Sequence, residues 1–217
     1  SNTGPFGGVQ SEVPLDQVEQ FGFVDVLNMV LRKSVAETRP GITALHAIPA
    51  PSNEDIVGIA DFYTSANARV QVIMTLTRLL RWNQSTQDWT NIPGAVHQLT
   101  GGTGDLFTWT VVNDILCFCQ GVDTIQAWNG ITGTFGDVSP NAFPAKYLME
   151  LETHLVSAYT VETGTPHTQR VRWSGSGDPT DWTSPSSGTN DILGDLGPIT
   201  GAVKIFQSGY IFHQWGI

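Results

Sequence analysis

A short motif, Leu79-Leu80-Arg81-Trp82-Asn83, decides the fold because it recurs twice further along the chain. Its counterparts are Ile125-Gln126-Ala127-Trp128-Asn129 and Arg170-Val171-Arg172-Trp173-Ser174, so the tryptophans stand 46 and 45 residues apart. Each motif opens into a polar turn, and a second aromatic residue follows it: Trp89, Phe135 and Trp182. This period is that of a propeller blade, an antiparallel sheet that must stack on neighbours to cover its faces. We therefore expect an all-β, β-propeller-like fold in which Trp82, Trp128 and Trp173 pack between blades.

Another apolar run precedes each motif, and turn-forming residues separate the runs. The runs occupy residues 70–76, 115–119 and 155–159, and a further run at 210–215 begins a fourth unit. Turn sequences mark the boundaries, namely Asn113-Asp114, residues 120–123, residues 163–166 and Ser208-Gly209. The pattern predicts hairpins, and hence repeated blades of three to four antiparallel strands.

Two regions differ in character. Residues 1–50 are predicted to form an extended N-terminal arm or linker, and residues 24–31 within it fit either one short amphipathic turn set or one strand. The turn Arg39-Pro40-Gly41 ends the arm, because Pro fixes φ and Gly tolerates positive φ. Residues 51–217 are predicted to form about three to four blades. The last blade is expected to be incomplete, as part of a longer chain or with strands supplied from elsewhere.

Composition narrows the possible functions. The chain has ten basic and twenty acidic side chains, a formal charge of −10, which argues against a surface that grips phosphates. No run is long and apolar enough to span a bilayer, and no signal peptide is evident. Cys117 and Cys119 alternate on one predicted strand and are expected to be a buried, reduced pair on one face. The scattered histidines give no metal-ligand spacing, so no metal or cofactor is assigned.

Several short motifs bear on possible chemistry. Residues 176–182 are similar to the Asp-box turn of sialidase-like propellers, which is structural, and the arginine cluster of a sialidase cannot be assigned here. The acidic loop 178–181 offers oxygen ligands of the type that Ca²⁺ prefers. The glycine-rich residues 100–105 lack the Gly-Lys-Ser/Thr of a phosphate loop and fit a blade-to-blade connection. No catalytic motif was found, and the chain is predicted not to be an enzyme.

The order of these features resembles a known family. The arm with Gly7-Gly8, residues 24–30 and Arg39-Pro40-Gly41-Ile42, followed by the repeats, resembles the tail nozzle or tail hub proteins (tail tubular protein B-like) of short-tailed bacteriophages. Arg172-Trp173-Ser174 with residues 177–183, Gly-Asp-Pro-Thr-Asp-Trp-Thr, is similar to a stretch that recurs in that group.

The resemblance implies a virion structural protein. It implies a homohexameric ring below the portal and adaptor that contacts other tail parts and lets double-stranded DNA pass without tight binding. The protein would be assembled in the host cytoplasm and located in the virion tail, without a membrane partner. An acidic lumen fits this role, because each Lys or Arg contact with phosphate adds affinity for DNA.

A second class of function stays open. In a carbohydrate- or receptor-binding propeller of the tail, exposed aromatics such as Trp89 or Trp182 would stack on a ligand. The polar turns after Trp82, Trp128 and Trp173 discriminate between the two classes. A shared pocket would favour binding, and separate outer edges would favour a scaffold.

Overall fold

A computed structural model describes residues 29–32, 35–38, 54–94, 99–102, 104–105, 107–130 and 133–216. The chain divides into two compact units, Ser1–Ala47 and Ile48–Ile217. In the first unit β1 (Met29–Arg32) pairs antiparallel with β2 (Val35–Thr38). This hairpin was not predicted within the arm. Arg39, Pro40 and Gly41 lie outside the described residues, so the predicted end of the arm stays a prediction.

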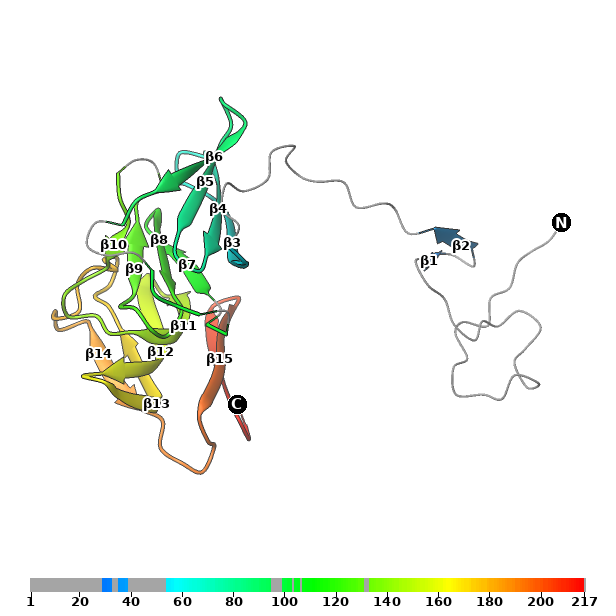
Figure 1. Cartoon of the computed structure of the whole chain (residues 1–217). Coiled ribbons are helices and arrows are strands. Elements are labelled where there is room, and N and C mark those ends of the chain that lie inside the picture. Colours follow the sequence, from blue (N-terminus) through cyan, green and yellow to red (C-terminus); the bar gives the residue numbers. More distant parts are fainter. Residues whose placement is uncertain are drawn as a thin grey trace, which may run out of the picture. The chain divides into compact units, whose positions relative to one another are not determined.

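The second unit repeats one four-stranded antiparallel meander three times (Figure 1). The first sheet contains β3 (Ile56–Tyr63), β4 (Arg69–Thr75), β5 (Leu79–Asn83) and β6 (Asp88–Ile92). The second contains β7 (Thr108–Val112), β8 (Ile115–Cys119), β9 (Gln126–Trp128) and β10 (Gly136–Asp137). The third contains β11 (Ala145–Leu151), β12 (His154–Glu162), β13 (Thr165–Trp173) and β14 (Gly188–Asp191). A fourth sheet pairs β15 (Ile199–Ile205) with β16 (Ser208–His213).

These sheets confirm the prediction of an all-β fold built from repeated antiparallel units. The described residues contain no helix, and their sheets are not closed into a barrel. The glycine-rich residues 100–105 lie between β6 and β7, that is, between two sheets, as expected for a connection. Closure of the sheets into a propeller ring stays a prediction.

Tight turns with positive φ set the hairpin registers. Asn113 (φ 48°) and Asp114 (φ 64°) connect β7 to β8, as their sequence predicted, because a two-residue hairpin turn of this kind needs positive φ at both positions. Glu152 (φ 49°) and Thr153 (φ 70°) form the equivalent turn before β12. A β-branched residue is strained there, and hydrogen bonds compensate. The Thr153 amide donates to Glu150 Oε1 at 2.9 Å, and the hydroxyls of Thr153 and Ser176 are 3.0 Å apart.

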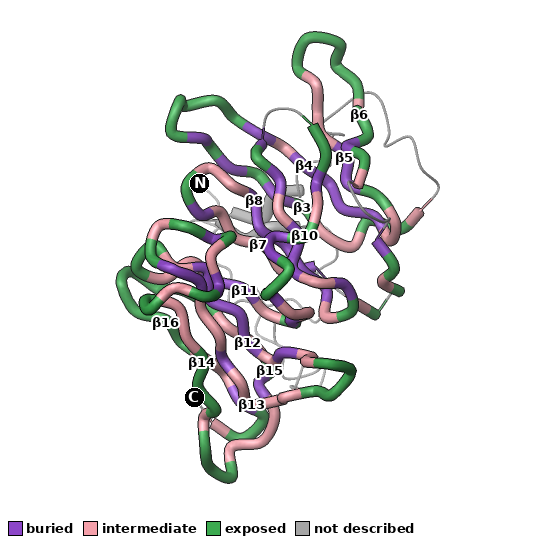
Figure 2. Tube along the Cα trace, turned by 90° about the vertical axis from the view of Figure 1, so that its left-hand side faces the viewer, coloured by how far each residue is buried: buried purple, intermediate pink, exposed green. Residues whose placement is uncertain are grey.

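Three apolar layers lie between successive sheets. The first and second sheets enclose a cluster that includes Val72, Leu79 and Phe118. The second and third sheets enclose Cys117, Cys119 and Leu155 among others, and the third and fourth enclose Met149, Val156 and Ile199. The opening strands of successive sheets lie against one another, β3 on β7, β7 on β11 and β11 on β15. Figure 2 shows the buried residues concentrated in the strands and the exposed ones at the connecting turns.

The two ends of this stack carry apolar side chains that the described residues leave exposed. On the face of the first sheet that points away from the second sheet, Ile59 is 64% and Tyr63 62% exposed. We call this the leading face. On the face of the fourth sheet that points away from the third, Val203, Ile205 and Tyr210 are each at least 40% exposed. We call this the trailing face.

Candidate functional site

The three repeat tryptophans occupy the third strand of their sheets. Trp82 lies in β5, Trp128 ends β9 and Trp173 ends β13. The spacing read from the sequence is therefore the spacing of equivalent strands. Their surroundings nevertheless differ.

Each tryptophan points to a different kind of neighbour. Trp128 is 2% exposed and packs in the cluster between the first and second sheets, where the Arg81 guanidinium lies 5.9 Å from its ring centroid. Trp173 pairs with Val156 in the third sheet and packs in the layer toward the fourth sheet. It therefore lies on the face of the third sheet that points away from the second sheet. Trp82 lies on the leading face, and its ring contacts Trp89 edge-on at 5.2 Å. Within the described residues Trp82 does not pack between two sheets, unlike the sequence-based expectation.

Trp182 packs between the second and third sheets. It lies in the loop between β13 and β14, is 6% exposed, and belongs to the cluster that contains Cys117 and Leu155. Its Nε1 donates to the Pro179 carbonyl at 2.9 Å. Since its ring is enclosed, Trp182 is not an exposed aromatic on which a ligand stacks.

The carboxylates beside Trp182 are engaged by their own turns. Asp178 Oδ1 accepts hydrogen bonds from the Thr180 amide and hydroxyl at 2.8 and 2.7 Å. Asp181 Oδ1 accepts from the amides of Thr183 and Ser184 at 3.0 and 3.1 Å. Backbone donation from Thr183, with further bonds from Ser184, lowers the pKa of Asp181. These two carboxylates therefore stabilise the loop that carries Trp182.

The same loop is tied to the turns of neighbouring hairpins. Asn113 Nδ2 donates to the Gly177 carbonyl, and the Gly177 amide donates to the Thr153 carbonyl at 3.1 Å. The stretch that carried the family resemblance thus joins the β7–β8 turn to the β11–β12 turn. Its role in this structure is to connect sheets.

The two cysteines are free and buried, as expected, and both side chains belong to the layer between the second and third sheets. Burial raises the pKa of the Cys119 thiol to about 12. The Thr108 hydroxyl, 3.3 Å from Cys119 Sγ, has a smaller effect that lowers this pKa. Burial, together with the neighbouring Cys119, raises the pKa of Cys117 as well. Such thiols are poor nucleophiles and poor metal ligands.

The described residues contain neither a cluster of metal-ligating side chains nor a helix that could span a membrane. No group of three or more His, Cys, Asp or Glu side chains is placed to hold a metal ion. Likewise, no helix in that part of the chain has the length and apolarity needed to cross a membrane.

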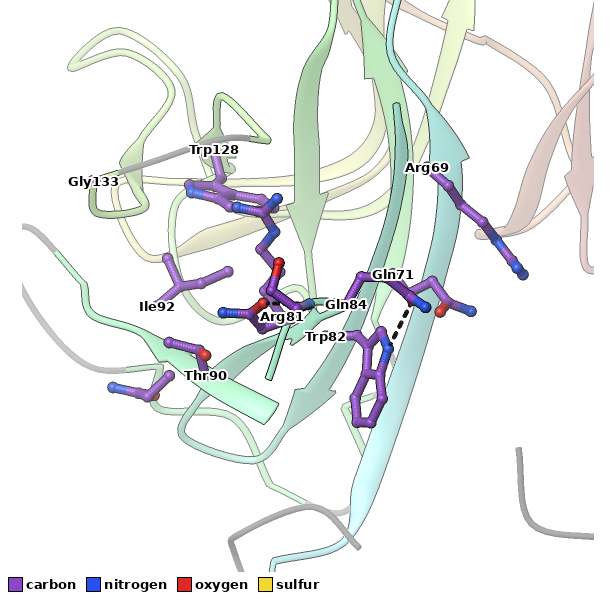
Figure 3. A pocket seen from close by; sticks show the side chains of 12 residues that line it. Arg69, Gln71, Arg81, Trp82, Gln84, Thr90, Ile92, Trp128 and Gly133 are labelled. Carbon is purple, nitrogen blue, oxygen red and sulfur yellow. Dashed lines mark hydrogen bonds between the residues drawn. The ribbon is translucent and has the colours of Figure 1, made fainter. Parts of the chain in front are cut away.

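A cavity of about 650 Å³ opens at the margin of the first sheet, where β4 and β5 diverge (Figure 3). We call it the β4–β5 notch. Its lining comes from β4, from β5 and the turn after it, from β6, and from the segment that follows β9. The residues are Arg69, Gln71, Arg81, Trp82, Asn83, Gln84, Ser85, Thr90, Asn91, Ile92, Trp128 and Gly133.

The lining of the notch shows where two of the three polar turns that follow the repeat tryptophans lie. Asn83, Gln84 and Ser85, which follow Trp82, line it together with Gly133, which follows Trp128. The loop after Trp173 does not line it and instead packs at the second and third sheets through Trp182. Two of the three turns therefore share a cavity, and the third has a structural role.

Sequence reasoning identified Trp82 and Trp128 but missed Gln71, Thr90 and Asn91. Single polar residues in strands carry no sequence signal, and only the pairing of strands brings these three to one cavity. Comparison with protein-family models and with curated proteins gave no match for this chain.

Proposed function

We propose that this protein is a structural component of a bacteriophage tail, part of the nozzle or hub ring through which DNA leaves the particle. The resemblance of its arm and of residues 172–183 to that family supports the proposal. The observation that carries it further is the apolar character of both ends of the sheet stack.

The end faces continue a series of like interfaces. Three successive layers bury aliphatic and aromatic side chains between antiparallel sheets. On the leading face Ile59 and Tyr63 are exposed beside the Asp61–Arg69 ion pair, while Ile73 and Leu80 are buried, and on the trailing face Val203 and Ile205 are exposed. Exposed apolar faces of this kind mark association surfaces. Because the two faces differ, contact between them would be head to tail, the geometry that builds rings.

Charge is consistent with a DNA passage. The formal charge of −10 leaves few cations to bind the phosphate backbone. We expect no retention of the protein on double-stranded DNA at about 150 mM salt, because binding of this kind scales with the phosphates neutralised.

The mass of the protein in solution tests the proposal. Light scattering behind a sizing column, with and without portal and adaptor proteins of a short-tailed phage, should detect a ring of about six chains. A chain that stays monomeric in every mixture would contradict it.

Two variants make this test specific. Val203→Lys places a charge on the trailing face, and we expect it to abolish ring formation without unfolding the chain. Leu193→Lys is the matched control, since Leu193 is 88% exposed in the segment between β14 and β15 and does not lie on that face. Equal assembly of the two variants would argue against the trailing face as an interface.

A further inference from the structure

The β4–β5 notch exists because the first sheet splays apart. β4 and β5 pair only over Val72–Arg81, Ile73–Leu80 and Met74–Leu79. β4 nevertheless begins at Arg69, and the β5–β6 ladder continues to Asn83 and Asp88. The start of β4 therefore separates from the tip of the β5–β6 hairpin, and residues from both faces of the sheet meet at the opening.

The lining of the notch mixes polar and apolar groups and holds no carboxylate among its described side chains. It combines the amides of Gln71, Asn83, Gln84 and Asn91, the hydroxyls of Ser85 and Thr90, and two indoles. This is unexpected in a chain with twice as many acidic as basic side chains. Amides and hydroxyls both donate and accept hydrogen bonds, as the hydroxyls of a sugar do. The indole faces supply the apolar surface on which the C–H groups of a sugar ring pack.

The two arginines at the notch already have partners. Arg69 Nε lies 3.0 Å from Asp61 Oδ1, and its guanidinium makes a second contact with the same carboxylate. Arg81 stacks over Trp128. Because the Arg69 charge is balanced, the site favours an uncharged ligand over a phosphate or carboxylate.

Trp128 supplies a further indication. Its Nε1 is a buried donor that has no acceptor in the part of the chain that the structure describes. A buried donor without an acceptor destabilises the folded state, because the loss of its hydrogen bonds to water is not compensated. Its ring lines the notch beneath the Arg81 guanidinium.

We propose that the β4–β5 notch is a binding site for a neutral oligosaccharide. The amides of Gln71, Gln84 and Asn91 bind its hydroxyls, and the Trp82 indole packs against a ring. The Trp82 Nε1 donates to Gln84 Oε1 at 3.2 Å, which holds the two side chains together before a ligand arrives (Figure 3). The volume lies within the roughly 300–1,000 Å³ typical of small-ligand sites.

A glycan screen with the whole chain tests this inference, followed by titration calorimetry of the hits. Two panels are compared, one of neutral oligosaccharides and one of carboxylated ones. We expect selective binding in the neutral panel with a Kd of about 0.1–1 mM, and a change in tryptophan fluorescence on binding. No binding in either panel at about 10 mM, or binding confined to carboxylated sugars, would overturn the proposal.

Matched variants locate the site. Gln84 and Asn91 are exposed, so the double variant Gln84→Ala with Asn91→Ala should fold normally and weaken binding at least about tenfold. Trp82→Ala should have a comparable or larger effect. Gln214→Ala and Trp215→Ala are the controls, since both residues are exposed and lie outside the notch. Equal loss of binding in the controls, or no loss in the notch variants, would place the ligand elsewhere.

This inference goes beyond the proposed structural role and fails independently of it. Gln84→Ala alone, in the turn after β5 rather than on the leading face, should assemble like the unmodified chain in the light-scattering measurement, whereas Val203→Lys should bind the sugar normally. Loss of assembly and loss of sugar binding are therefore separate results.

Discussion

The second and fourth sheets both contain strands with large apolar side chains, but these side chains differ in exposure. β8 reads Ile-Leu-Cys-Phe-Cys, and Leu116 and Phe118 on it are fully buried. β16 reads Ser-Gly-Tyr-Ile-Phe-His, and its Tyr210 is 41% exposed. The second sheet has a neighbouring sheet on each face, whereas the fourth is covered on one face within the described residues. The contrast shows that the exposure of an apolar strand residue depends on whether a neighbouring sheet covers its face, and not on residue type alone.

The second and fourth sheets should differ most in the free energy of unfolding that is lost when an aromatic side chain is truncated. Phe118 contacts Phe107 and Phe135 at ring-centroid distances of 5.9 and 5.8 Å. Phe118→Ala should lower the free energy of unfolding by about 3–5 kcal/mol, because it leaves a cavity between two sheets. Tyr210→Ala on the trailing face should cost less than about 1 kcal/mol. Urea denaturation measures both, and similar losses would remove the distinction between the sheets.

Thiol reactivity should report the enclosure of the second sheet. With the pKa of Cys119 at about 12, its thiolate at pH 8 is about a thousandfold rarer than that of an ordinary cysteine. We expect alkylation of the folded protein at pH 8 to be slower than that of the urea-unfolded protein by at least this factor. Rapid labelling of Cys117 or Cys119 in the native state would show that the layer between the second and third sheets opens readily.

A glycine in the third sheet tests packing at its margin. A Cβ on Gly188 would lie 2.3 Å from Cζ2 of Trp173, so that ring must shift. Gly188→Ala should cost about 1–3 kcal/mol in thermal or urea unfolding. Gly102→Ala is the control, because the nearest atom to its added Cβ is Asp105 Oδ2 at 3.6 Å. A neutral Gly188→Ala would mean that the Trp173 ring has room to move.

Acid should produce the smallest effect, and it should begin at the margins of the sheets. The Thr75 hydroxyl donates to Glu54 at 2.6 Å and lowers the pKa of that carboxyl, and the Arg170 guanidinium lowers the pKa of Asp191. Carboxyls with a lowered folded-state pKa stabilise the protein above their ordinary values of 4.5 and 3.8 and lose that contribution as the pH falls further. The melting temperature should be flat from pH 7 to about 5 and then decrease.

Hydrogen exchange gives the location of that acid effect. The amides of β14, where Asp191 lies, should lose protection before those of β8. Glu54→Gln should remove part of the pH dependence while leaving the neutral-pH exchange of β8 unchanged. Simultaneous loss of protection in β8 and β14 would contradict the contrast between enclosed and marginal strands.

The central strands of each sheet were predictable from sequence. Residues 70–76, 115–119 and 155–159 are apolar runs, and except for residue 76, which follows β4, they lie in β4, β8 and β12, the second strands of their sheets. These strands are buried on both faces and so read as continuous apolar segments. The third strands were found through their tryptophans.

The outer strands were missed for physical reasons. β14 is Gly-Thr-Asn-Asp, which is polar and mostly exposed, and it forms only because it pairs with β13. β11 and β15 end in turns at Glu152-Thr153 and at Phe206, whose positive φ values of 49°, 70° and 55° are atypical of these residue types. The expected turn at Ser208-Gly209 is displaced, since Ser208 already begins β16.

The candidate ligand site was predictable only in part. Trp82 and Trp128 stood out by their spacing, yet the notch depends on where the β4–β5 ladder stops. That point is a property of strand register, which depends on side-chain packing across the whole sheet. Gln71 and Asn91 therefore become recognisable only once the strands are placed.

The opposite facing of Trp128 and Trp173 limits how freely these units can be exchanged. Both end the third strand of their sheet, but one serves the preceding sheet and the other the following sheet. Because a strand alternates its faces at every residue, a change of one position in register is enough to reverse which neighbour receives the indole. A chimera made by aligning the tryptophans would therefore join a unit whose indole faces the preceding sheet to one whose indole faces the following sheet. The repeat is a module in length and topology, but each copy has become specific to its place in the series.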